Sequence, residues 1–220
     1  MKLVLAAATG ATGRLVLDRA RSSGHDVTAL VRSPAKLPPG IPHARIDFSA
    51  PDAGALAAAV AGADAVVSAL GATGKADAGV ARTGTAALVE AMRESGVRRL
   101  VVLSAAPIGT VPTLRRPDKP RHDPGDGPLL RLVTPIVKRA LAEHYADLAA
   151  MEDVVLDSGL EWTVVRPPRL TDGAAKGTWR TAVGCNPRNG STISRADLAA
   201  AMLDAATDPA SAGKILGVAY

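Results

Sequence analysis

The sequence predicts a Rossmann-like doubly wound α/β fold: a parallel sheet with helices on both faces and a small C-terminal cap. Two observations predict it. Short apolar, β-branched runs alternate with segments of helical periodicity, and a glycine-containing loop separates the first run from the first helix. Such alternation builds right-handed βαβ units whose parallel strands are covered on both faces. With 220 residues, 47% of them hydrophobic, we expect one domain over residues 1–220.

The first half of the chain supplies most of the expected sheet. The expected strands are 2–7, 26–31, one that ends near residue 46, 63–70 and 98–104. The helices expected between them are 14–22, 51–60 and one that ends near residues 95–96. Each helix is long enough to return the chain to the start of the next parallel strand.

Residues 106–128 interrupt this alternation, because prolines stand there among four basic residues. We expect a lid loop, since structureless segments of this length inside a domain are usually functional. A helix expected over about 129–158 contains Pro135, which predicts a kink or a start near residue 134. The remaining elements are strands at 161–166, 178–183, 192–193 and 214–219 and a helix from residue 195. Residues of about 167–195 are expected to form a small cap on the substrate side.

Composition excludes several classes of protein. The lone Cys185 cannot form an intramolecular disulfide, which favours a reducing compartment, and we expect the cytoplasm. The apolar run 3–8 is too short for a signal peptide, and no stretch reaches the roughly 18 apolar residues of a membrane span, so we expect no membrane partner. Despite a net charge of +5, only 2% of the residues are aromatic, and we expect no nucleic-acid partner. A monomer is expected, with a dimer as the alternative.

The first loop carries the strongest chemical signal. Ala7, Gly10 and Gly13 occupy the G-x-x-G-x-x-G spacing of a dinucleotide site, between a strand and a helix. Small residues there permit a tight turn and bring backbone N–H groups to a pyrophosphate at the helix N-terminus. Ala7 departs from the pattern, because one turn must then tolerate a methyl group. The alternative is a glycine turn without a ligand.

Arg32 is the second signal. It lies 19 positions after Gly13 (32 − 13 = 19), at the end of the second expected strand, with Ser33 and Lys36 close by. An acidic residue there would bind a ribose hydroxyl, whereas arginine suits a 2′-phosphate. The sequence therefore favours NADP(H), with NAD(H) as the second possibility. The alternative is a solvent-facing arginine after a strand.

Several motifs carry a family resemblance. The motifs are Ala8-Thr9-Gly10-x-Thr12-Gly13, the segments 24–32 and 64–71, Ser158-Gly159-Leu160-Glu161-Trp162-Thr163-Val164-Val165-Arg166-Pro167-Pro168, and Ile193-Ser194-Arg195-Ala196-Asp197-Leu198-Ala199. Through them the chain resembles the atypical short-chain dehydrogenase/reductases called NAD(P)H-binding or NmrA-like proteins, and within them the biliverdin-IXβ and flavin reductases. The resemblance covers nearly the whole chain except the proline-rich segment.

The resemblance implies a role for individual residues. It places the pyrophosphate on Thr9, Gly10, Ala11, Thr12 and Gly13, the 2′-phosphate on Arg32, the adenine beside Asp47 and Phe48, and the nicotinamide beside Leu70, Gly71, Ser104 and Pro168. It makes Ser104 the candidate catalytic residue. Arg169, a candidate substrate contact, replaces a histidine of the flavin reductases, which puts biliverdin or flavin specificity in doubt. Ser104 has an alternative reading as a hydroxyl that caps a strand end.

The expected chemistry follows from a missing acid. Tyr145 is not read as catalytic, because the lysine that typical short-chain dehydrogenases place four residues later is Ala149 here. His122 and His144 are read as surface residues, and nothing has the spacing of metal ligands. Without an acid, hydride transfer suits a conjugated acceptor that spreads the incoming charge, such as a flavin, a quinone or a linear tetrapyrrole.

The expected function is therefore an NAD(P)H-dependent reductase that acts on such a small-molecule acceptor. Two alternatives remain: a non-catalytic regulator that senses NADP(H), and a biosynthetic tailoring reductase or isomerase. The lid cations Arg115, Arg116, Lys119 and Arg121 are expected to help capture an anionic acceptor.

Overall fold

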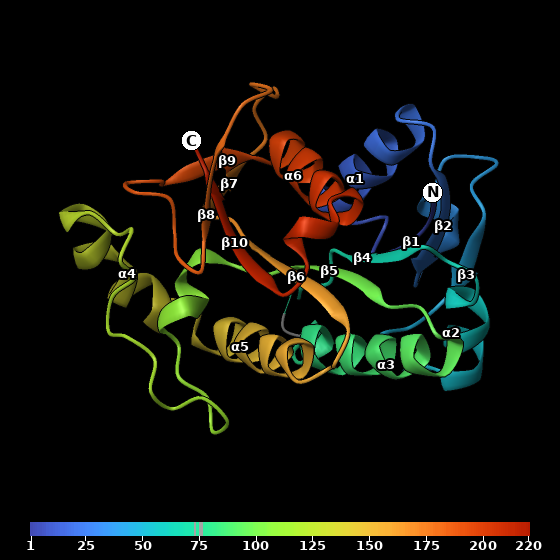
Figure 1. Cartoon of the computed structure of the whole chain (residues 1–220), viewed down its shortest axis with the longest axis horizontal. Coiled ribbons are helices and arrows are strands. Elements are labelled where there is room, and N and C mark those ends of the chain that lie inside the picture. Colours follow the sequence, from blue (N-terminus) through green and yellow to red (C-terminus); the bar gives the residue numbers. More distant parts are fainter. Residues whose placement is uncertain (73, 75–76) are drawn as a thin grey trace.

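The computed structural model describes residues 1–72, 74 and 77–220, and its centre is an eight-stranded sheet (Figure 1). The strand order is β3-β2-β1-β4-β5-β6-β10-β8. Its strands are β1 (Lys2–Ala6), β2 (Asp26–Val31), β3 (His43–Arg45), β4 (Ala65–Ser68), β5 (Arg99–Leu103), β6 (Glu161–Arg166), β8 (Arg180–Val183) and β10 (Lys214–Ala219). All pairings are parallel except that of β10 with β8.

Helices cover both faces of this sheet. One face packs against α1 (Ala11–Ser22) and α6 (Arg195–Thr207). The other packs against α2 (Ala53–Val60), α3 (Val80–Ser95) and α5 (Ala142–Leu156). Figure 1 shows the two layers on opposite sides of the strands. The short strands β7 (Arg169–Thr171) and β9 (Thr192–Ser194) pair in a separate two-stranded sheet near the C-terminus. The predicted doubly wound fold is confirmed.

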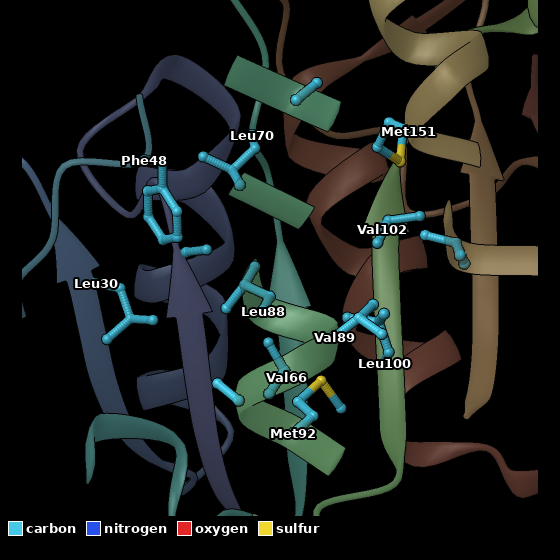
Figure 2. Packing of buried hydrophobic residues seen from close by; sticks show 14 of the residues in the cluster. Leu30, Phe48, Val66, Leu70, Leu88, Val89, Met92, Leu100, Val102 and Met151 are labelled. Carbon is cyan, nitrogen blue, oxygen red and sulfur yellow. The ribbon is translucent and has the colours of Figure 1, made fainter. Parts of the chain in front are cut away.

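The core beneath the sheet explains why the central strands are apolar along their whole length. Every residue of β4 is buried, because helices cover it from both sides. On one face, Leu88 and Met92 of α3 belong to the same buried cluster as Val66 of β4 and Leu100 of β5, as Figure 2 shows. Full burial of each such side chain contributes about 1.5–3 kcal/mol to folding.

The topology creates a switch point at β1. The chain runs from β1 to β2 and β3 on one side, then returns across the sheet to β4 on the other side of β1. The helices that follow β1 and β4, α1 and α3, pack on opposite faces of the sheet, so a crevice opens between them. In doubly wound sheets this crevice is the place where ligands bind.

Two elements differ from the sequence-based expectation. The long helix divides at Leu141 into α4 (Pro128–Ala140) and α5, and Pro135 lies inside α4. Pro135 is exposed, so water can replace the helix bond that it cannot make. The break separates packing partners: α5 packs on the sheet, whereas Lys138 of α4 donates to the carbonyl of Thr110 in the lid segment at 2.7 Å. Strand β8, expected in the cap, joins the edge of the main sheet.

The lid segment begins with a short 3₁₀ helix, Ala106–Thr110, and runs irregularly to Gly127. Across the described ranges, none of the helices combines the length and the apolar character that a membrane span requires.

Candidate functional site

The loop after β1 folds as a glycine-dependent turn. Ala7 has a φ of 60°, a left-handed conformation that an L-residue adopts at a cost of about 1–2 kcal/mol. Its carbonyl accepts a hydrogen bond from the N–H of Gly10 at 3.0 Å. A Cβ on Gly13 would stand 2.1 Å from the same carbonyl oxygen, so only glycine fits there. The structure thus gives a steric reason for glycine at position 13, and alanine at position 7 is accommodated with strain.

Helix α1 begins directly after this turn. Its N-cap is Gly10, which offers no side-chain cap, and the first turn carries no acidic residue. Backbone N–H groups of a first turn have no partner within the helix and carry a partial positive charge. An uncapped N-terminus without a carboxylate is suited to a phosphate-bearing ligand.

A cavity of about 200 Å³ lies at the switch point, above the carboxyl ends of β1, β2 and β4. Its lining residues are Ala7, Thr9, Gly10, Leu30, Val31, Arg32, Ser33, Lys36, Asp47, Phe48, Leu70, Gly71, Asp77 and Val80. Phe48 and Leu70 form part of its apolar wall, and Figure 2 shows them side by side above α3. Both side chains pack against Gly84, where an added Cβ would lie 2.8 Å from Leu70 Cδ1.

The charged rim of this cavity is organised around Arg32. Its Nη1 lies 2.9 Å from Asp77 Oδ1, and the hydrogen bond and attraction of Asp77 raise the pKa of Arg32 above its usual value. Asp47 accepts hydrogen bonds from the hydroxyl and the N–H of Ser49, which lower its pKa. Arg32 therefore remains cationic and Asp47 anionic at neutral pH. A phosphate bound by Arg32 must compete with Asp77.

The structure brings together part of the expected cofactor set. Thr9, Gly10, Arg32, Asp47, Phe48, Leu70 and Gly71 all line the cavity. Ala11, Thr12 and Gly13 form the first turn of α1, where Thr12 is buried. Pro168 follows β6, and the exposed Arg169 begins β7. Neither residue lines this cavity.

Ser104 belongs to a buried network that the sequence did not predict. Its hydroxyl donates to Glu152 Oε1 of α5 at 2.6 Å. Arg166, at the end of β6, donates to both oxygens of Glu152, with Nε at 2.8 Å from Oε1. The side chains of Glu152 and Arg166 are almost fully buried, where charges persist only when paired. In the sequence, the signal for this buried network is Arg166, a charged residue at the end of an apolar strand.

This network fixes the direction of the Ser104 proton. Because the hydroxyl hydrogen points at Glu152, the oxygen presents lone pairs to its other neighbours. Toward a further partner at the end of β5, the Ser104 hydroxyl can therefore only accept a hydrogen bond.

A second and larger cavity is lined by residues that follow β4 and by the residues where α4 and α5 meet. Its volume is about 760 Å³. It is lined by Ala72, Gly74, Ala78, Gly79, Arg139, Ala140, Leu141, Ala142, Glu143, His144 and Asp147. Asp147 accepts hydrogen bonds from the N–H groups of Ala81 and Arg82, at 3.1 and 3.0 Å, and so fixes the start of α3 against α5. Leu70, Gly71, Asp77 and Val80 line the small cavity, and their neighbours in the sequence, Ala72, Gly74, Ala78 and Gly79, line the large one. His144, read from the sequence as a surface residue, lines the large one.

None of the four lid cations, Arg115, Arg116, Lys119 and Arg121, lines either of these two cavities. Arg115 pairs with Asp157 at 2.6 Å, and Arg116 pairs with Asp153 and Asp157 at 2.7 and 2.6 Å. Lys119 donates to the carbonyl of Ile108 at 3.1 Å. These bonds hold the lid along α5. The two arginines pair with the carboxylates of Asp153 and Asp157 at the C-terminal end of α5. Arg116 and Lys119 also line a separate cavity of about 290 Å³, together with Glu152 and Arg166. Capture of an anionic acceptor by the four lid cations stays a prediction.

Tyr145 lies in the core beneath the sheet. Its side chain is buried among apolar residues, and burial raises the pKa of its hydroxyl. The residue four positions later is Ala149, which is itself buried. No tyrosine–lysine pair therefore forms at this position.

Known structures share the whole fold. The oxidoreductase YlbE of Lactococcus lactis is 19% identical, with a TM-score of 0.80, over 100% of this chain and 90% of that chain. The anaerobilin reductase ChuY of Escherichia coli O157:H7 is 20% identical, with a TM-score of 0.77, over 100% and 97%. A short-chain dehydrogenase/reductase of Veillonella parvula, in complex with NADP, is 18% identical, with a TM-score of 0.76, over 100% and 94%. At these identities the likeness concerns the fold.

Sequence comparison gives a family. A Schizosaccharomyces pombe protein of the UPF0659 group is 32% identical over 127 residues, which is 55% of this chain and 48% of that protein. The match thus spans about half the length of that relative. Residues 7–209 match the model of the NAD(P)H-binding family, from the glycine turn to the end of α6. With the loop, the cavity and this match in agreement, the chain belongs to the NAD(P)H-binding family.

Proposed function

We propose that this protein is a reductase that binds NADPH in the switch-point cavity and passes hydride to a conjugated small-molecule acceptor. The observation that carries the proposal is the cavity itself: it joins an uncapped helix N-terminus, an apolar wall and the cations Arg32 and Lys36. The Veillonella parvula protein of the same fold was crystallised with NADP, and the Escherichia coli protein of the same fold is an anaerobilin reductase. Both support the proposal by analogy of fold.

The cavity residues fit the parts of the cofactor. The N–H groups at the start of α1 would bind the pyrophosphate, because Gly13 lets the turn approach closely. Arg32 and Lys36 would hold the 2′-phosphate, and Phe48 would flank the adenine. The reduced nicotinamide supplies the hydride when bound. The protein's own task is to hold the two reactants in contact and to exclude water.

The acceptor would enter the larger cavity, whose lining residues neighbour those of the cofactor cavity in the sequence. Its rim offers the cation Arg139 and the imidazole of His144, which can orient an anionic or carbonyl-bearing acceptor. A conjugated acceptor is favoured, because Tyr145 is buried in the core and the Ser104 hydroxyl hydrogen is committed to Glu152. Neither group is placed to neutralise the alkoxide that a simple ketone would develop.

Turnover assays test this function. Purified protein is mixed with NADPH and, separately, with FMN, a quinone, a bilin and a simple ketone, and the loss of nicotinamide absorbance is followed. We expect turnover with at least one conjugated acceptor and little with the ketone. NADPH binding without turnover of any acceptor would favour the NADP(H)-sensing regulator. Faster turnover of the ketone would contradict the acceptor class.

A further inference from the structure

Helix α4 presents an apolar face to solvent. Leu129, Leu132 and Ile136 are 72%, 71% and 68% exposed, and Val133 is 39% exposed. Their spacing of three, four and seven residues places them on one side of the helix. Four of the eight large apolar side chains that are exposed in the described residues therefore lie on this single helix. Monomeric proteins rarely gather exposed apolar side chains in this way without a partner.

The rest of α4 fixes the helix to the protein. Lys138 donates to both the carbonyl and the hydroxyl oxygen of Thr110, at 2.7 and 3.1 Å. Leu130 and Val137, each about 100° around the helix from Leu129 and Ile136, are half-buried. Figure 1 shows α4 at one end of the molecule, next to the lid segment and beyond the edge of the sheet. The apolar face thus points away from the body that holds it.

The charge of α4 has one sign. Between Pro128 and Ala140 the sequence contains Arg131, Lys138 and Arg139 and no aspartate or glutamate. Arg139 is exposed at the edge of the apolar face, and Arg131 is exposed on the opposite side of the helix. The nearest carboxylates in the sequence, Asp126 and Glu143, lie outside the helix. An amphipathic helix with a leucine- and isoleucine-rich face and with arginines but no carboxylate of its own is suited to an anionic surface.

A second copy of the chain fits this face less well. The 13 residues of α4 form a helix about 20 Å long, and two such helices alone cannot supply the roughly 800 Å² per partner of a stable interface. Their pairing would also place Arg139 of each copy at the interface with no carboxylate on the helix to balance it. A bilayer surface imposes neither limit, because apolar side chains enter it individually and anionic headgroups neutralise the arginines.

We propose that α4 docks the protein on an anionic membrane surface, with Leu129, Leu132, Val133 and Ile136 in the headgroup region and Arg131 and Arg139 on anionic headgroups. This docking revises the expectation of no membrane partner, which considered spanning segments alone. Arg139, Ala140 and Leu141 also line the larger cavity. Docking therefore places the mouth of that cavity at the bilayer. The docking itself does not depend on the proposed reductase activity.

Vesicle co-sedimentation of the full chain tests the proposal. We expect the protein to bind phosphatidylcholine vesicles that contain phosphatidylglycerol at least tenfold more tightly than pure phosphatidylcholine vesicles. Leu132→Asn with Ile136→Asn should lower this binding by tenfold or more, because two anchoring side chains no longer enter the bilayer. Arg131→Gln with Arg139→Gln should weaken it by about tenfold or more and remove most of its salt dependence.

The matched control is Val183→Asn, which alters an exposed apolar residue on β8, away from α4. It should bind as the wild type does. Because all these positions are exposed, the variants should keep the fold, which circular dichroism checks. Equal binding to neutral and anionic vesicles, no binding to either, or an equal loss in Val183→Asn would overturn the proposal. A dimer in analytical ultracentrifugation that dissociates in the Leu132/Ile136 variant would replace it with a second copy of the chain.

Discussion

Single residues set the conformation of the cofactor turn, and Ala7 is the informative one. Because its φ of 60° suits glycine, Ala7→Gly should raise the free energy of unfolding by about 0.5–1 kcal/mol. Gly13→Ala in the same turn should lower it, since its Cβ would stand 2.1 Å from the Ala7 carbonyl oxygen. Urea unfolding of the three proteins measures both effects. Destabilisation by Ala7→Gly would show that the methyl group stabilises the turn.

The buried tyrosine gives a second prediction at the residue scale. Tyr145→Phe should keep nearly all turnover of whichever conjugated acceptor works, because this side chain packs in the core. Steady-state rates of the variant and the wild type, compared after circular dichroism confirms the fold, measure the effect. A collapse of turnover in a folded Tyr145→Phe protein would assign an acid role to this hydroxyl.

Several site residues were predictable from local sequence, and others were not. The glycine spacing and the arginine after the second strand follow from the local geometry of a strand–turn–helix unit, so Gly10 and Arg32 were identified. The ion pair between Arg32 and Asp77 and the network of Ser104 with Glu152 join residues 45 and 48 positions apart. No periodicity encodes such pairings, because the packing of separate elements creates them.

At the element scale, Asp197 connects α6 to the C-terminal strand and the cap. Burial disfavours its charged form, but hydrogen bonds from the Tyr220 hydroxyl, the N–H groups of Lys176 and Gly177 and the Ser194 hydroxyl outweigh burial and lower its pKa. A carboxylate with a lowered folded-state pKa stabilises the protein above its unfolded pKa of about 4. That stabilisation is lost as the pH falls through the folded value.

Asp197→Asn should therefore lower the free energy of unfolding at neutral pH by about 2 kcal/mol or more, since hydrogen bonds to a charged group are lost. The difference from the wild type should shrink as the pH falls from about 4 through the lower folded-state pKa, because protonation then removes the carboxylate from the folded state as well as from the unfolded state. Urea unfolding across pH 3–7 measures it. A difference that does not change with pH would assign the effect to packing instead.

Some elements were predicted with the correct bounds from the sequence, and others were not. The strands 26–31, 161–166 and 214–219 were predicted with their observed bounds, because apolar runs with turn residues at both ends have one interpretation. The sequence predicted a kink or a start near residue 134, whereas the long helix divides at Leu141 and Pro135 lies inside α4. Proline costs little on an exposed helix side, whereas the break depends on the different partners of α4 and α5.

At the scale of the whole molecule, the order of the strands places the glycine turn, Arg32 and Gly71 at one crevice although they are far apart in sequence. The alternation of strands and helices predicted this arrangement, since parallel strands bring their carboxyl ends to one edge. The exposed face of α4 and the ion pairs of the lid with α5 were not predicted. Both features depend on how the lid segment packs against the protein, and its sequence has no regular hydrophobic pattern that would predict this packing.

The pairing of Arg32 with Asp77 leads to a prediction about cofactor selection. Asp77→Asn should increase affinity for NADPH by a few-fold, because Arg32 is released from a competing carboxylate. Affinity for NADH should change less, since NADH carries no 2′-phosphate. Fluorescence titration of both cofactors measures the ratio. A loss of NADPH affinity in Asp77→Asn would mean that Asp77 holds Arg32 in its binding position.

Calorimetric titration of NADPH and NADH into the wild type and Arg32→Ala tests the central claim most directly. If Arg32 reads the 2′-phosphate, the variant should bind NADPH about tenfold to hundredfold more weakly and NADH almost unchanged, because charge-assisted hydrogen bonds to one anion are lost. Arg32→Asp should go further, because its carboxylate repels the phosphate. Equal losses for NADPH and NADH in Arg32→Ala would contradict the account.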